Sequence, residues 1–181
     1  MYDLTLIKTN KDEAIALAKK LGFSSIFFID KTSILKNIRD IRHGRLNIVL
    51  GGDDELNRRI LNNKNTTILL NPEPNIKDSL KQVNSGLNQV LCELAYKNKI
   101  AIAFSLNRLE NTNIIPKIKQ NIRLCRKYKI KMLFFTLAET KYELRAAHDL
   151  LSLLRILGMT PLEAKCALTG INEIMNGKQY K

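Results

Sequence analysis

The sequence contains few of the residues that form metal centres and redox sites. Its 181 residues include no tryptophan, two histidines and three cysteines, and aromatic residues make up only 6% of the chain. Cys92, Cys125 and Cys166 are tens of residues apart, so no C-x-x-C pair indicates a zinc site or a redox dithiol. His43 and His148 are also far apart, which argues against an imidazole-rich metal centre. We therefore expect three reduced, mostly buried cysteines and no metal bound by the protein.

Nucleotide-binding fingerprints and membrane-spanning segments are missing as well. Neither G-x-G-x-x-G nor G-x-x-x-x-G-K-[ST] occurs, so no dinucleotide site and no P-loop is expected. No apolar run approaches the roughly 20 residues that span a bilayer. The N-terminal stretch contains Asp3 and lacks the apolar region of a signal peptide. We expect a cytoplasmic protein with no membrane contact.

The chain has a large excess of positive charge. It contains 30 Lys and Arg against 17 Asp and Glu, a formal net charge of +13. Such an excess attracts polyanions, and nucleic acid is the leading candidate, although a lysine-rich solubilising surface would give the same composition. Because aromatic residues are scarce, contact with the phosphate backbone is favoured over a platform of stacked bases.

Short apolar runs alternate with longer amphipathic stretches, which is the pattern of repeated βα units in one domain over residues 1–181. The apolar runs predict strands at residues 2–7, 24–30, 45–52, 66–72, 99–106 and 131–137, with a short seventh strand at 154–157. The amphipathic stretches predict helices at 10–22, 32–41, 53–63, 87–98, 116–130, 143–158 and 160–168, and a loop at 73–86. The pattern allows an incomplete barrel or an open doubly wound sheet.

Two helix starts carry capping signals. Asn10 is the predicted N-cap of the first helix, with Glu13 at its N3 position. Thr160 is the predicted cap of the last helix, followed by Pro161 at N1 and Glu163 at N3.

The stretch "LGGDDELNRRIL" (residues 50–61) has two interpretations. Asp53, Asp54 and Glu55 follow a predicted strand, where carboxylates accept the free N–H groups of a starting helix and favour its positive end. We favour this capping role. A magnesium site would need further carboxylates at other strand ends. The available ones are Asp3, Asp30 and Glu139.

Three pairs of cations are candidate phosphate contacts: Arg58 and Arg59, Arg123 and Lys127, and Lys141 and Arg145. The first pair has no local structural duty that the neighbouring acids do not already perform. The second places like charges one helical turn apart, which destabilises a helix slightly. A phosphate-facing edge would explain this arrangement, and a solvated face of a lysine-rich protein would explain it equally well. The third pair lies four residues apart and is free to meet a partner, because surface ion pairs within the segment are weak.

No catalytic side chain is expected in the chain itself. Ser105 ends the fifth predicted strand but has no histidine in a recognisable partnering motif. His148 lies in a predicted helix, where a hydrogen-bonded structural role is favoured over general-base chemistry.

Three stretches, in this order and spacing, resemble one known family. They are "LGGDDELNRRIL", "NSGLNQVLCELAYKNKIAIAFSLNRLEN" and "MLFFTLAETKYELRAAHDLLSLLRILGMTPLEAKCAL". They are similar to the archaeal ribonuclease P protein component three, the counterpart of the eukaryotic thirty-kilodalton ribonuclease P subunit. The most specific positions are Gly51, Gly52, Asp53, Asn57 and Arg58, the run 86–91, the "IAFSL" strand and residues 138–158.

The resemblance implies a barrel-like α/β fold related to metal-dependent phosphoesterases. It also implies a protein subunit of ribonuclease P, the RNA-based endonuclease that removes 5′ leaders from precursor tRNA. The expected partners are ribonuclease P RNA, a small ribonuclease P partner protein and the other ribonuclease P proteins. The RNA would be the catalyst, with Mg²⁺ expected for the holoenzyme. By residue match, the resemblance transfers RNA contact to Arg58, Lys141 and Arg145, whereas Arg59, Arg123 and Lys127 rest on local reasoning alone.

Two alternatives from other classes remain. The related phosphoesterases carry a D-L-H-x-H-like metal motif on the first strand, and the matching positions here read Asp3, Leu4, Thr5 and Leu6, without histidine. A degenerate or active phosphoesterase would have to use the four carboxylates named above. The other alternative is a small-molecule barrel enzyme whose basic surface is incidental.

Overall fold

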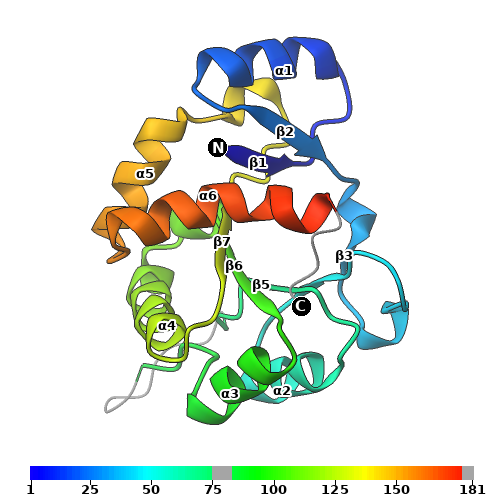
Figure 1. Cartoon of the computed structure of the whole chain (residues 1–181), viewed down its shortest axis with the longest axis vertical. Helices are drawn as coiled ribbons and strands as arrows, with labels where there is room; N and C mark the ends of the chain where they lie inside the picture. Colours follow the sequence, from blue (N-terminus) through cyan, green and yellow to red (C-terminus); the bar gives the residue numbers. More distant parts are fainter. Residues whose placement is uncertain (75–82, 177–181) are drawn as a thin grey trace.

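Parallel strands connected by helices make up the computed structural model, which describes residues 1–74 and 83–176 (Figure 1). The strands are β1 (Tyr2–Thr5), β2 (Ser25–Phe28), β3 (Ile34–Leu35), β4 (Ile48–Leu50), β5 (Ile68–Leu70), β6 (Ala101–Ser105) and β7 (Met132–Phe135). One parallel sheet has the order β3-β4-β5-β6-β7, and β1 and β2 form a separate parallel pair.

Six α-helices and several short 3₁₀ turns connect these strands in the described residues. The helices are α1 (Lys11–Lys20), α2 (Asp54–Asn62), α3 (Gln89–Lys97), α4 (Ile115–Lys127), α5 (Ala147–Ile156) and α6 (Pro161–Met175). The 3₁₀ turns are η1 (Lys31–Ser33), η2 (Ile38–Asp40), η3 (Leu106–Glu110), η4 (Thr112–Ile114) and η5 (Lys141–Glu143). Part of the predicted loop at 73–86, residues 75–82, lies outside the described residues. No helix within 1–74 and 83–176 combines the length and hydrophobicity of a membrane span.

The two predicted caps have different outcomes. At α6, Thr160 and Glu163 form the complete capping box: the Glu163 N–H donates to Thr160 Oγ1, and the Thr160 N–H donates to Glu163 Oε2. At α1, Asn10 occupies the predicted N-cap position, but its backbone is left-handed (φ 53°) and its side chain makes no cap hydrogen bond. Asparagine tolerates this conformation better than most residues, so Asn10 serves the turn instead.

Two predicted elements are wrong for a tertiary reason. The helix expected at 32–41 is replaced by η1, β3 and η2, because Ile34 and Leu35 pair with Ile48 and Val49 of β4. Pairing with a neighbouring strand overrides the weak local helix preference. The strand expected at 154–157 is the end of α5, whose Leu154 is buried. The described residues thus contain seven strands, as predicted, but the one that was misplaced is β3 (Ile34–Leu35) and not residues 154–157.

The last strand lies beside the first, and this contact turns the two sheets into one incomplete barrel. The Leu6 N–H donates to Ala138 O (2.8 Å), and the Leu137 N–H donates to Leu4 O (3.2 Å). The spatial order is β2-β1-β7-β6-β5-β4-β3, and β2 and β3 do not pair within the described residues. The barrel-like α/β fold is thus confirmed and the open doubly wound sheet is not formed.

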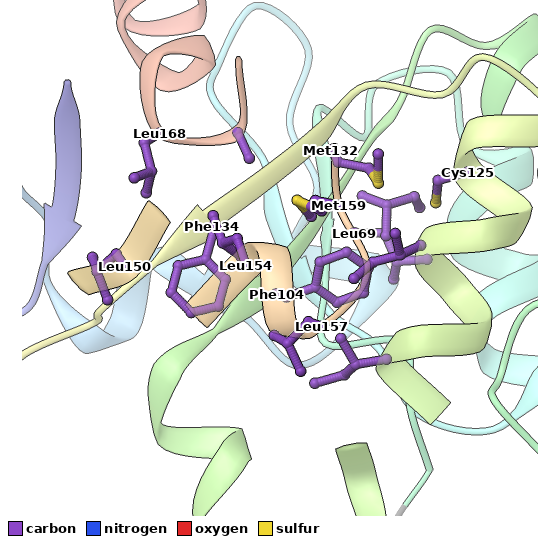
Figure 2. Close-up of a cluster of buried hydrophobic side chains, with 14 of the residues drawn as sticks. Leu69, Phe104, Cys125, Met132, Phe134, Leu150, Leu154, Leu157, Met159 and Leu168 are labelled. Carbon is purple, nitrogen blue, oxygen red and sulfur yellow. The ribbon is translucent and has the colours of Figure 1, made fainter. Parts of the chain in front are cut away.

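Both faces of the five-stranded sheet are buried. The inner face contributes the smaller cluster: Ile48, Ile68, Leu70, Ala101, Ala103, Leu133 and Phe135, together with Leu4 and Leu6 of the β1 segment. The outer face contributes Val49, Leu69, Ile102, Phe104, Met132 and Phe134, which pack with the helices. Figure 2 shows Phe104 and Phe134 directed toward the leucines of the α5 segment. Burial on two sides explains why these strands are almost uninterruptedly apolar.

Helix α6 contacts both β7 and β1, and so reinforces the contact between the ends of the barrel. In Figure 1 it crosses between the β1–β2 pair and the larger sheet. A Cβ at Gly170 would lie 2.5 Å from Lys131 Cε and 2.8 Å from Leu133 Cδ2, so a larger residue would have to displace these two side chains of the β7 segment. Leu168 joins the outer cluster and Ile171 the inner one.

The cysteines match the expectation that most are buried. Cys92 and Cys125 belong to the outer-face core, whereas Cys166 is exposed on α6. Burial raises the pKa of the Cys92 thiol to about 11 and that of Cys125 well above its usual value. The two buried thiols are therefore protonated at neutral pH and behave as small apolar side chains.

Asp3 holds the contact between β1 and β7 from inside the protein. Its Oδ1 accepts hydrogen bonds from the Leu4 and Thr136 N–H groups (both 2.8 Å), and its Oδ2 accepts one from Thr136 Oγ1. Burial raises the pKa of Asp3 to about 6, even though these hydrogen bonds oppose the rise. The folded protein thus binds this proton more tightly than an unfolded chain, whose Asp pKa is 3.8. The contribution of Asp3 to stability is fully present below about pH 4 and is lost as the pH rises through about 6.

Asp3→Asn should abolish this pH dependence and keep the hydrogen bonds. The amide oxygen can accept from both N–H groups, and the NH₂ group can donate to Thr136 Oγ1. The charged carboxylate costs about 3 kcal/mol at neutral pH, so the melting temperature of the variant should rise relative to wild type between about pH 4 and 7. Circular dichroism melts of both proteins measure this difference. Asp3→Ala, which lacks the acceptors, should melt lower at every pH, and parallel profiles for wild type and Asp3→Asn would contradict the raised pKa.

Candidate nucleic-acid interface

The acids that follow β4 start a helix. The Asp53 carboxylate accepts a hydrogen bond from the Leu56 N–H (2.8 Å), and Asp54 and Glu55 occupy the first turn of α2. This is the predicted capping arrangement, and it confirms the favoured interpretation of the stretch.

Asn57 is the buried centre of the loops at the carboxyl ends of β4 and β5. Its Nδ2 donates to Gly52 O (3.1 Å), Pro72 O (2.9 Å) and Gly86 O (2.8 Å), and its Oδ1 accepts from the Gly52 N–H (3.0 Å). The amide thereby joins three segments far apart in sequence. The sequence analysis named Asn57 only as a position of the family resemblance and gave it no structural role, although its place one turn before the apolar Ile60 put it on the same face of the predicted helix.

Gly86 is required by the same cluster. It has φ +77°, and a Cβ there would lie 1.9 Å from Pro72 O and 3.0 Å from Asn57 Nδ2. Both the left-handed backbone and the close approach exclude other residues. Close packing against Pro72 and Asn57 therefore explains why the "GLNQVL" run begins with a glycine.

Ser105 is part of a second buried contact between β5 and β6. Asn71 Nδ2 donates to Ser105 Oγ (2.7 Å), and the Ser105 N–H donates to Asn71 Oδ1 (2.9 Å). Asn71 has a left-handed backbone (φ 50°), which this pair of bonds stabilises. The hydroxyl is thus engaged in structure, as expected when no histidine activates it.

Glu73 is the most strongly perturbed acid of this end of the barrel. Its Oε1 accepts from Asn121 Nδ2 (2.9 Å), and burial raises its pKa to about 7, although Arg108 and Lys117 act in the opposite direction. Arg108 Nη2 donates to the Glu73 carbonyl (2.6 Å), and the buried Lys117 Nζ donates to Pro74 O (3.1 Å). These groups anchor residues 71–74, and no sequence pattern announced them, because their partners are 34 or more residues away.

Four of the six predicted phosphate contacts lie on the outer surface of α2 and α4. Arg58 and Arg59 are exposed on α2, and within the described part of the chain neither side chain forms an ion pair or hydrogen bond. Arg123 is likewise exposed on α4. Lys127 is exposed at the end of α4 with its Nζ 5.4 Å from the centre of the Tyr128 ring. Among the described residues, no acidic side chain pairs with these four cations and competes with a phosphate.

Lys141 and Arg145 lie in and just after η5, beyond the carboxyl end of β7. The prediction that both are free is wrong for Lys141, which forms an ion pair with Glu13 of α1, and this hydrogen bond raises its pKa. Arg145 Nη1 donates to the Tyr142 and Leu144 carbonyls (both 3.1 Å). Tyr142, which sequence reasoning missed, is 79% exposed between the two cations. An exposed ion pair is weak, so a polyanion can still compete for this turn.

The three predicted pairs do not form one site. Helix α3 lies between α2 and α4 and contacts both, so it separates Arg58 and Arg59 from Arg123 and Lys127 (Figure 1). The η5 turn belongs to a different part of the barrel, beside α1. The candidate interface is therefore an extended set of separate contacts, which suits a long polyanion better than a small ligand.

The carboxylates of the phosphoesterase alternative do not converge. Asp3 is buried at the β1–β7 contact, Asp53 caps α2, and Glu139 forms an exposed ion pair with Lys31 (2.7 Å), while Asp30 is exposed without such a pair. Within residues 1–74 and 83–176, no group of three or more His, Cys, Asp or Glu residues could hold a metal ion. No observation of the fold therefore favours this alternative.

Known proteins are similar to this chain in sequence and in fold. A family model described as RNase P subunit p30 matches residues 29–181. The ribonuclease P protein component 3 of Methanococcoides burtonii is 27% identical over 208 residues, covering 93% of this chain and 83% of the relative. That of Thermococcus kodakarensis is 28% identical, covering 87% of this chain and 72% of the relative. That of Methanosarcina acetivorans is 30% identical over 132 residues, a match that spans 70% of this chain and about half (52%) of the relative.

A solved structure has the same fold. A chain in the cryo-EM structure of archaeal ribonuclease P with mature tRNA superposes with a TM-score of 0.77 at 21% identity, covering 99% of this chain and 92% of that one. Because the family model spans everything from the end of β2 to the last residue, including α2 and its caps, this chain belongs to the RNase P subunit p30 family of ribonuclease P proteins.

Proposed function

We propose that this protein acts in the cytoplasm by binding ribonuclease P RNA together with a small partner protein and the other ribonuclease P proteins, and that it supports the active fold of the RNA. Membership of the RNase P subunit p30 family is the observation that carries this proposal. The solved chain of the same fold comes from an archaeal ribonuclease P bound to mature tRNA, which agrees with a role in tRNA 5′ maturation.

The chemistry of the chain supports binding and not catalysis. Hydrolysis of a phosphodiester needs an activated nucleophile, or metal ions held by several converging ligands. The side chains of Ser105 and Asn71 form hydrogen bonds with each other. The candidate carboxylates have separate structural roles, such as the cap of α2 at Asp53 and the ion pair of Glu139 with Lys31. The RNA would then supply the reacting groups and hold the Mg²⁺ ions of the holoenzyme.

The exposed cations of α2 and α4 supply the affinity in this proposal. Arg58, Arg59 and Arg123 are exposed, and no acid of residues 1–74 and 83–176 forms an ion pair with them. Each such contact sets free condensed counterions from the RNA, which favours binding at low salt. Guanidinium groups also bind phosphate through two parallel hydrogen bonds.

Affinity for ribonuclease P RNA should fall steeply with salt. If four to six phosphates are neutralised, raising the salt concentration fourfold should weaken binding by roughly 50- to 2,000-fold. Filter binding or fluorescence anisotropy with labelled RNA over a salt series measures the slope. An affinity that does not change with salt would contradict phosphate contact as the main source of binding.

A double variant tests the choice of residues. Arg58→Gln with Arg145→Gln should lower RNA binding and precursor-tRNA cleavage by a reconstituted holoenzyme by about tenfold, because two phosphate contacts are lost. Lys20→Gln with Arg155→Gln removes the same charge from exposed positions of α1 and α5 and should keep near wild-type activity. Omission of the protein from the mixture sets the lower limit. Equal activity of the two double variants would reject these two arginines as contacts, and cleavage that does not depend on the protein would reject the function.

Asn57→Ala should act through stability, in contrast to the arginine variants. It removes the donor to three backbone carbonyls and the acceptor of the Gly52 N–H, all of them buried or half-buried. The free energy of unfolding should fall by roughly 3 kcal/mol, measured by urea denaturation. Asn62→Ala, at the exposed end of the same helix, is the matched control and should cost much less. Similar losses for both would show that the Asn57 cluster is not important for the fold.

A further inference from the structure

The amino ends of β4–β7 surround a cavity of about 1020 Å³. We call it the basal cavity. It lies at the opposite ends of the strands from the Asn57 cluster, where the helix-to-strand connections enter the sheet. It is lined by residues 43–46, 64–67, 95–101 and 129–131 and by Ile174.

The lining is strongly basic. Its charged side chains are Arg45, Lys64, Lys97, Lys99, Lys129 and Lys131, and His43 lies beside them. None of the described lining residues is acidic. Lys131 pairs with Glu173 of α6 (2.7 Å). In contrast, no acidic side chain of the described residues forms an ion pair with Arg45, Lys64, Lys97 or Lys129. Within the described residues, no ion pair with an acid therefore offsets the repulsion among these four cations.

Stabilisation of helix ends does not explain all of these lysines. Lysine in a last turn favours the negative end of a helix, and Lys97 of α3 fits that role. Lys99 and Lys129, however, follow the ends of α3 and α4 and have left-handed backbones (φ 56° and 55°). At each, two backbone hydrogen bonds close the helix, for example from Ile100 N–H to Ala95 O and from Lys99 N–H to Tyr96 O. Glycine is the residue that adopts this closing position without strain.

Other features of the lining fit an unpaired nucleic-acid strand. The cavity volume equals a cube about 10 Å on each side, which leaves room for a few nucleotides but not for a double helix. Tyr96 is 60% exposed at the cavity and offers a ring for a base to stack on. Cations from four separate connections surround the same space, so several phosphates of one strand could be contacted together.

We propose that the basal cavity is a second RNA-binding site, which holds the phosphodiester backbone of a single-stranded segment of ribonuclease P RNA. The proposal rests on the proposed function, in that it takes this RNA as the partner. It differs from the α2, α4 and η5 contacts, because it lies at the other end of the strands from the η5 turn and uses none of the same residues. An acidic protein segment would also complement the positive charge of the cavity. Charge alone, however, does not explain the exposed ring of Tyr96, on which a base can stack.

The test is a triple variant, Arg45→Gln, Lys97→Gln and Lys129→Gly, in the full chain. Lys129→Gly removes a charge and also supplies the residue that the backbone at φ 55° prefers, so it should not lower the melting temperature. The dissociation constant for labelled ribonuclease P RNA should rise at least tenfold. The slope of log affinity against log salt should flatten by about two. A single-stranded oligouridylate should compete for the wild type better than a duplex of equal length does, and this preference should disappear in the triple variant.

The matched control is Lys19→Gln, Lys20→Gln and Arg155→Gln, which removes the same charge from exposed sites on α1 and α5. It should change the affinity less than threefold and the salt slope by less than one. Equal effects of the two triple variants would overturn the proposal, because net charge alone would then explain them. A lower melting temperature of Lys129→Gly with unchanged affinity would also overturn it, since the lysine would then serve the helix end.

Two further outcomes separate this proposal from the proposed function. If the wild type binds the RNA and the triple variant binds it equally well, the basal cavity is not an RNA site, whereas the proposed function stands. If the triple variant instead loses another ribonuclease P protein from the reconstituted complex while its RNA affinity is unchanged, the cavity holds an acidic protein segment and the RNA assignment is wrong. If the wild type itself fails to bind the RNA, the proposed function fails, and this proposal fails with it.

Discussion

The first strand meets the last through two backbone hydrogen bonds and the buried contact of Asp3 with Thr136, and the barrel-like fold depends on this junction. Without it, the β1–β2 pair and the five-stranded sheet would be two small sheets with exposed edges, which are prone to pair with other chains. Helix α6 covers the same contact, and its Gly170 lets it approach β7 closely. The acid of the first strand is thus used inside the protein, at the contact between the two ends of the barrel.

The two ends of the strands have different chemistry. At the carboxyl ends, Asn57, Asn71, Glu73 and Ser105 form hydrogen bonds with backbone carbonyls or with other side chains, so few polar groups are left for catalysis. At the amino ends, the connections carry lysine and arginine side chains around an open cavity. In most barrel enzymes the carboxyl ends carry the function and the amino ends the stability. If the basal cavity binds RNA as we propose, this protein reverses that division.

Local sequence signals predicted the elements whose cause is local. The capping box at Thr160 and the cap at Asp53 depend on residues within one helical turn, and both are present as expected. The apolar run that became β6 was recognisable because both of its faces are buried. The errors, at 32–41 and 154–157, concern segments in which a distant partner decides: β4 for the first, and for the second the core that buries Leu154. A local pattern carries no information about such partners.

The sequence by itself determined the charge, the βα alternation, the caps and the scarcity of metal ligands, because these follow from composition and from neighbours along the chain. The tertiary structure alone decided which charges act together. It paired Lys141 with Glu13 across the barrel, separated the α2 and α4 arginines by α3, and gathered the cations of four connections around one cavity. The physical reason is distance: electrostatic and hydrogen-bond energies depend on separation in space, which the order of residues does not give until the strands are paired.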